Sequence, residues 1–125
     1  MGNWRFDEVV VIDLEATCWD TTAEKEVFIS EIIEIGVCLL NVLTGEVSKP
    51  RGLIVKPINA IVSPFCTSLT SITQDMVEQG MAFNDATNIL KKEYGVSRKI
   101  MAAYGNYDQN MLKIECERNN LSPTV

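Results

Sequence analysis

The chain has 125 residues, of which 46% are apolar, and a formal net charge of −6 from 17 acidic and 11 basic side chains. This length and apolar content suit one compact domain, residues 1–125, with its own hydrophobic core. The acidic balance excludes a protein that holds nucleic acid through its overall charge. No apolar run is long enough to span a membrane and no segment resembles a signal peptide, so we expect a cytoplasmic protein, or a nuclear one in a eukaryote, with no membrane partner.

The first expected element is a strand over residues 8–15, which ends in two acids. Its β-branched apolar residues suit a buried central strand packed on both faces. Side chains alternate along a strand, so Asp13 and Glu15 face the same side. Two carboxylates beside a buried strand are costly unless a cation lies between them, and Mg²⁺ takes oxygen ligands. The motif therefore indicates either a divalent-metal site or two acids that simply reach solvent.

The next elements are expected to alternate between extended and helical segments. Polar and small residues predict a loop over 17–30, and two further strands are expected over 31–40 and 46–56, joined by a turn. After these strands, cap residues and apolar spacing predict two helix starts, at Ser63 and Thr73, a helix over 84–94 with Gly95 as its C-cap, a strand over 99–104, and a helix over 106–119. The order β-β-β-α-β-α predicts an α/β fold with a mixed sheet and helices packed against it.

A third acid, Asp108, stands in the first turn of the last expected helix. A helix N-terminus stabilises an acid in that position, which alone explains a first-turn aspartate. The topology gives a second interpretation. If the strand over 99–104 lies beside the strand over 8–15, both end at the same edge of the sheet, and Asp108 reaches Asp13 and Glu15. Three converging acids would need metal or protons to coexist.

Four blocks of the sequence, in this order and spacing, resemble the DEDDh family of 3′–5′ exonucleases. The subgroup they resemble trims histone messenger RNA and small interfering RNA. The blocks are residues 12–18, 31–36, 65–74 and 104–108. The resemblance extends over nearly the whole chain. It implies a ribonuclease-H-like fold and metal-dependent removal of nucleotides from a 3′ end.

The resemblance also implies roles for the three acids. Asp13 and Glu15 would hold a first Mg²⁺ or Mn²⁺, and Asp13 would bridge to a second ion. Asp108 matches the acid that supports this second ion, often through water. Paired ions of this kind stabilise the attacking and the leaving oxygens of the phosphodiester.

Two further pairs of residues match positions of the family that contact substrate. Ala16 and Thr17 would meet the terminal sugar through backbone and hydroxyl. Leu69 and Ile72 would pack against the terminal base, although core packing is the favoured role for Ile72 on its residue type alone.

The chain departs from the family at its catalytic base. The family requires a histidine and a fourth acid on a helix after one more strand, and the chain contains no histidine. We therefore expect a C-terminally incomplete fold that lacks the last strand and helix of the family. The chain would be a fragment or truncated form, which is the favoured explanation, or would be completed by a second chain, or would be a relative that binds without cleaving.

The resulting hypothesis is a phosphodiester hydrolase, a 3′–5′ exonuclease that releases nucleoside 5′-monophosphates from the 3′ end of RNA or single-stranded DNA. The 125 residues alone are expected to show weak activity or none, because a general base contributes about 10²–10⁴-fold in rate. The alternative is a non-catalytic module on the same fold that binds nucleic acid or protein. A purely structural domain with solvated acids is the third possibility.

Overall fold

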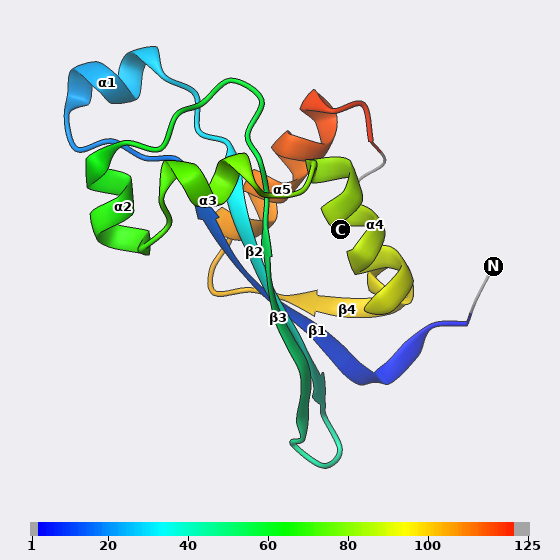
Figure 1. Cartoon of the computed structure of the whole chain (residues 1–125). Helices are drawn as coiled ribbons and strands as arrows, with labels where there is room; N and C mark the ends of the chain where they lie inside the picture. Colours follow the sequence, from blue (N-terminus) through cyan, green and yellow to red (C-terminus); the bar gives the residue numbers. More distant parts are fainter. Residues whose placement is uncertain (1–2, 122–125) are drawn as a thin grey trace.

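The structure, a computed structural model, describes residues 3–121 as a mixed sheet with helices packed against it. Its strands lie in the order β3-β2-β1-β4, with β1 antiparallel to β2 and parallel to β4 (Figure 1). The strands are β1 (Arg5–Ala16), β2 (Ile32–Asn41), β3 (Val47–Ile54) and β4 (Lys99–Ala102). The helices are α1 (Thr22–Val27), α2 (Pro64–Thr70), α3 (Gln74–Glu78), α4 (Phe83–Glu93) and α5 (Tyr107–Arg118), with a 3₁₀ turn, η1 (Val96–Arg98). The mixed sheet predicted from the β-β-β-α-β-α order is confirmed.

The strand β1 is buried on one face rather than on both. Val10, Ile12 and Leu14 alternate on the buried face, whereas Val9 and Val11 are half-buried on the face that carries Asp13. The expectation of a strand packed on both faces was wrong. In the main core, as far as residues 3–121 show it, side chains of α4 and α5 pack against the β1 face that carries Val10, Ile12 and Leu14.

The main core lies between the sheet and the helices α4 and α5. The apolar stripe predicted for α4 is confirmed, with Phe83, Ala86 and Leu90 buried in this cluster together with Leu112 of α5. Gly95 follows α4 with a φ of 69°, a left-handed conformation that glycine adopts without strain. Apolar burial of this kind is the main stabilising contribution to the sheet–helix packing.

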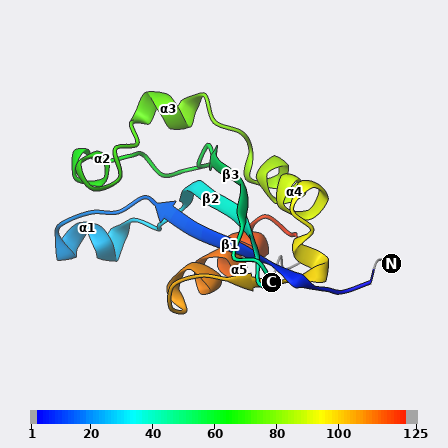
Figure 2. The same cartoon turned by 90° about the horizontal axis from the view of Figure 1, so that it is seen from below.

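The helices α1 and α2 lie beyond the end of β1, away from α4, and α3 lies between α2 and α4 in both views (Figure 1, Figure 2). As predicted, Ser63 and Thr73 cap α2 and α3 with their hydroxyl groups. The prediction of a loop over residues 17–30 was wrong for the middle of this segment, where α1 forms. Thr21 caps this helix by accepting the N–H of Glu24 at 3.2 Å, and its hydroxyl donates to the Glu24 carboxylate at 2.8 Å.

Two predicted strands are shorter than expected. The third strand ends at Ile54. Val55 still donates its N–H to the Ile33 carbonyl of β2 at 2.9 Å, but on its other side it forms an isolated parallel bridge with Met81. The fourth ends at Ala102, before Gly105 turns the chain into α5 with a φ of 70°. No helix within residues 3–121 is long and apolar enough to span a bilayer.

Candidate active site

The end of β1 presents two of the predicted acids on one face of the sheet. Asp13 pairs with Gly36 of β2, and Glu15 pairs with Glu34. Asp13 is exposed and Glu15 is half-buried. A Cβ at position 36 would lie 3.3 Å from the Asp13 carbonyl oxygen and 3.9 Å from the Asp13 Cβ, so a side chain at this position would crowd Asp13. The alternation expected from the sequence therefore places both carboxylates at the same edge, as predicted.

The third acid reaches the same place from α5. The parallel pairing of β4 with β1 brings both strands to one edge of the sheet, where α5 begins (Figure 1). The buried Asp108 accepts the backbone N–H of Leu14 through its Oδ2, at 3.1 Å. Because Leu14 stands between Asp13 and Glu15, this bond fixes Asp108 beside both. The predicted convergence of the three acids is confirmed, whereas their chemical roles remain predictions.

Burial and neighbouring carboxylates raise the pKa of two of these acids, Asp108 and Glu15. Burial raises the pKa of Asp108, and the adjacent Asp13 carboxylate raises it further against the opposing effect of the Leu14 N–H. Burial also raises the pKa of Glu15, with contributions from Asp13, Glu34 and Asp108. Like charges at close range disfavour ionisation of each group. A divalent cation or a proton would relieve this repulsion.

The donor chemistry of this cluster fits a hard divalent cation. Asp13, Glu15 and Asp108 offer carboxylate oxygens, the ligands that Mg²⁺ and Mn²⁺ prefer. Within residues 3–121, no group of three or more Cys, His, Asp or Glu side chains is already arranged as a metal-ligand set. Mg²⁺ needs only one or two protein carboxylates and keeps several waters, so a complete protein cage is not required.

The two residues predicted to meet a terminal sugar follow directly on these acids. Ala16 is half-buried, and its carbonyl accepts the Cys66 thiol with Sγ at 3.6 Å. Thr17 is only 1% exposed, and its hydroxyl oxygen accepts the N–H of Glu31 at 2.9 Å. The hydroxyl of Thr17 thus has a role within the fold, and contact of both residues with a sugar remains a prediction.

The two residues predicted to meet a terminal base differ in accessibility. Leu69 on α2 is 65% exposed and is free to contact a ligand. Ile72 is buried in a second apolar cluster with Ile33, Cys66 and Val77. Ile72 therefore has the core-packing role favoured for its residue type, and its contact with a base stays a prediction.

The site contains two residues that the sequence reasoning missed. Glu34 lies beside Glu15, and its carboxylate covers Gly52, where a Cβ would come within 2.9 Å of Oε2. Tyr107 is 62% exposed as a whole residue, but partial burial of its hydroxyl, together with Asp108, Cys18 and Glu15, raises the pKa of that group. Both residues stand inside the blocks that resemble the exonuclease family, which is the signal that could have identified them.

Comparison with known proteins agrees with this geometry. The profile of the RNase_T family, described as an exonuclease family, matches residues 10–124. The 3′–5′ exoribonuclease 1 of Mus musculus is 36% identical over 131 residues, which cover 96% of this chain and 36% of that protein.

Two solved structures share the fold. The nuclease domain of 3′hExo, described as a DEDDh family member bound to rAMP, superposes with a TM-score of 0.78 at 34% identity. It covers 97% of this chain and 64% of that one. A structure titled as 3′-end specific recognition of histone mRNA stem-loop by 3′-exonuclease superposes with a TM-score of 0.75 at 34% identity, covering 98% of this chain and 56% of that one.

The expected ribonuclease-H-like α/β fold is confirmed by these structures. The chain spans about a third of the length of the curated relatives it matches, since it covers 36% of the mouse protein. The profile match covers most of the chain, and the resemblance to the DEDDh exonucleases is likewise confirmed. The chain therefore belongs to the RNase_T exonuclease family.

Proposed function

We propose that this chain carries the metal-binding and 3′-end-binding site of a 3′–5′ exonuclease acting on RNA or single-stranded DNA. The observation that supports this proposal best is the hydrogen bond that the Leu14 N–H donates to Asp108, since it brings the third acid to the residue that stands between Asp13 and Glu15. Membership of an exonuclease family supports the same reaction, the hydrolysis of the terminal phosphodiester with release of a nucleoside 5′-monophosphate.

The three acids would hold Mg²⁺ or Mn²⁺ at the end of β1. A bound divalent ion supplies charge stabilisation for the attacking and leaving oxygens of the phosphodiester. Asp13 and Glu15 would bind from the sheet and Asp108 from α5, directly or through water. Because Asp108 is held by a backbone N–H, its position does not depend on the ion.

The 3′-terminal nucleotide would lie between β1 and α2. Ala16 and Thr17 would contact the sugar, and the exposed Leu69 would pack against the base. Tyr107, exposed beside the acids, offers an aromatic face on which a base can stack. These contacts are local, which agrees with the acidic net charge of the chain.

The absence of histidine limits what these 125 residues can catalyse. A base that takes the proton of the attacking water contributes about 10²–10⁴-fold. We therefore propose weak activity or none for this chain alone, and higher activity where a longer form of the protein or a second chain supplies a histidine. Binding of nucleic acid without cleavage is the second candidate function, and the missing histidine is the observation that favours it.

Of the two nucleic acids, RNA is favoured by the relatives. One is named an exoribonuclease and another is described in recognition of the histone mRNA stem-loop. Discrimination of RNA from DNA would depend on contacts to the 2′-hydroxyl of the terminal sugar.

A labelled oligonucleotide tests the proposal. The wild-type chain, Asp13→Ala and the matched control Asp20→Ala, which removes an exposed acid outside the site, are incubated with a 5′-labelled strand and Mn²⁺. Products that shorten from the 3′ end with wild type and control, and disappear in Asp13→Ala, support the exonuclease. Metal-dependent binding without products supports the binding module. A shortening ladder that persists in Asp13→Ala contradicts the proposed centre.

A further inference from the structure

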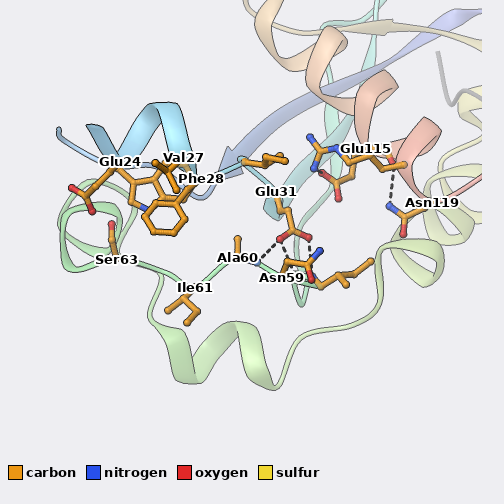
Figure 3. A pocket seen from close by; sticks show the side chains of 14 residues that line it. Glu24, Val27, Phe28, Glu31, Asn59, Ala60, Ile61, Ser63, Glu115 and Asn119 are labelled. Carbon is orange, nitrogen blue, oxygen red and sulfur yellow. Dashed lines mark hydrogen bonds and ion pairs between the residues drawn. The ribbon is translucent and has the colours of Figure 1, made fainter. Parts of the chain in front are cut away.

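A buried carboxylate outside the acid cluster holds the segment that leads into α2. Glu31 is 5% exposed, and its side chain accepts three successive backbone N–H groups. Ile58 donates to Oε1 at 2.8 Å, Asn59 donates to Oε2 at 2.9 Å, and Ala60 donates to Oε2 as well (Figure 3). Hydrogen bonds to an ionised acceptor are roughly twice as strong as neutral ones. The three bonds together offset the cost of burying this charge.

The same residue is bonded through its backbone to the end of β1. Thr17 donates its N–H to the Glu31 carbonyl at 2.9 Å, and the Glu31 N–H donates to the Thr17 hydroxyl at 2.9 Å. Ser30 adds a bond from its hydroxyl to the Thr17 carbonyl at 2.8 Å. Glu31 therefore joins the segment 58–60 directly to Thr17, which follows Ala16 at the end of β1.

The helix that carries Asp108 is bonded to the residues on either side of Glu31. Glu115 accepts the N–H of Ile32 at 3.3 Å, and Arg118 donates to the Ser30 carbonyl at 3.0 Å. Glu115 lies about two turns beyond Asp108 on α5, and Arg118 lies about three turns beyond it. The three elements of the proposed site, namely the end of β1, α2 and α5, are thus connected around one position.

The segment 58–60 has little apolar packing that could replace the carboxylate. Ile58 is 72% exposed and Ile61 is 70% exposed. Both line a cavity of about 640 Å³ between this segment, α1 and α5, and Glu31 and Glu115 line it as well (Figure 3). An element without buried side chains opens readily unless polar bonds hold it. Its position therefore depends mainly on Glu31.

We propose that Glu31 is a positioning residue for recognition of the 3′ end. Its carboxylate fixes the segment 58–60 that leads into α2. It thereby supports the place of α2 and Leu69 relative to the acids, which Ser63 and Cys66 also hold through their bonds to the carbonyls of Cys18 and Ala16. This inference rests on the proposed function, because it assigns Glu31 to the binding of the same terminal nucleotide. A small displacement of a positioning element is enough to reduce productive binding strongly.

The test compares Glu31→Gln with Glu24→Gln in the full chain. Glutamine keeps the shape of Glu31 but turns an amide NH₂ toward backbone donors, so at least one of the three bonds is lost. Glu24 lines the same cavity on α1 and loses the same charge, but it holds no part of the segment 58–60. Glu31→Asp, which retains the charge but retracts it by one methylene, is the second variant in case Glu31→Gln does not fold.

Two measurements are made on each variant. Amide hydrogen exchange at residues 58–60 is expected to rise about tenfold in the Glu31 variants and to stay unchanged in Glu24→Gln. Affinity is measured with Mn²⁺ for an oligonucleotide that ends in a 3′-hydroxyl and for the same strand ending in a 3′-phosphate, with phosphorothioate linkages that slow cleavage. The preference of wild type for the 3′-hydroxyl strand is expected to fall roughly tenfold in the Glu31 variants.

Three other results would contradict either the role of Glu31 or the proposed function. Equal loss of affinity for both strands, with the preference unchanged, would mean that Glu31 only supports folding, and would overturn this inference while leaving the proposed function intact. Unchanged exchange at residues 58–60 would also overturn the inference. A folded wild-type chain without preference for the 3′-hydroxyl strand would overturn the proposed function, and the role of Glu31 with it.

Discussion

Replacement of Asp108 by asparagine should make the metal-free chain more stable and its response to metal weaker. Asparagine keeps a carbonyl oxygen that can accept the Leu14 N–H now held at 3.1 Å, so the local backbone contact survives. The negative charge is removed. Because burial and Asp13 raise the folded-state pKa of Asp108 above 3.8, ionisation of wild type costs stability as pH rises from 3.8 through that raised value. At neutral pH the variant avoids this cost.

The effect of metal has the opposite sign. A ligand that binds only the folded state stabilises it by about 2.7 kcal/mol at a concentration of 100 Kd. For a chain of this size, at roughly 4 °C per kcal/mol, Tm of wild type should rise by about 10 °C. If loss of Asp108 weakens binding about 100-fold, the upper end of the range for groups that support a metal, the same concentration gives about 0.4 kcal/mol, or roughly 2 °C.

Thermal unfolding followed by circular dichroism, with EDTA and then with Mn²⁺, checks both signs. Asp85→Asn is the matched control, because Asp85 stands in the first turn of α4 and is exposed. The reasoning is refuted if Asp108→Asn lowers Tm in EDTA, or if its Tm rises with Mn²⁺ as much as that of wild type.

Three further predictions concern groups around the site. Thr17→Val should lower the free energy of unfolding by about 1–3 kcal/mol in urea titrations, since it leaves the buried Glu31 N–H without an acceptor; an unchanged value would contradict this. Burial, with a hydrogen bond to Cys66, raises the pKa of the Cys18 thiol to about 11, so Cys18 should react with iodoacetamide about 100-fold more slowly near pH 8 than an ordinary thiol. Burial also raises the pKa of Glu115 above 4.5 in the folded chain. Wild type therefore loses stability as pH rises from 4.5 through this raised pKa, and Glu115→Gln should gain stability relative to wild type between about pH 4 and pH 7. A stability difference between Glu115→Gln and wild type that shrinks as pH rises would contradict the last prediction.

Local signals predicted much of the fold. The caps at Ser63 and Thr73 and the glycine at 95 predicted where three helices begin or end, because each depends on the conformation of one or two residues. The helix α1 was missed because it buries no side chain and so shows no apolar stripe. Its signal in the sequence was Thr21 as an N-cap residue, with Glu24 three residues later.

The part of the candidate site whose position depends only on the order of the strands could be predicted from the sequence. Parallel pairing of β4 with β1 was enough to bring Asp108 to the end of the first strand. Glu34 was missed because its place beside Glu15 depends on the strand register next to a β-bulge. The bond that the Ile58 N–H donates to Glu31 joins residues 27 positions apart and follows no short-range pattern, so only the structure reveals it.

Binding of Mn²⁺ to the folded chain, followed by calorimetry, tests the central claim most directly. We predict that wild type binds at least one Mn²⁺ and that Asp13→Ala, with its circular dichroism unchanged, loses this binding. Equal binding of Mn²⁺ by wild type and Asp13→Ala, or no binding by a folded wild-type chain, would contradict a metal centre built from Asp13, Glu15 and Asp108.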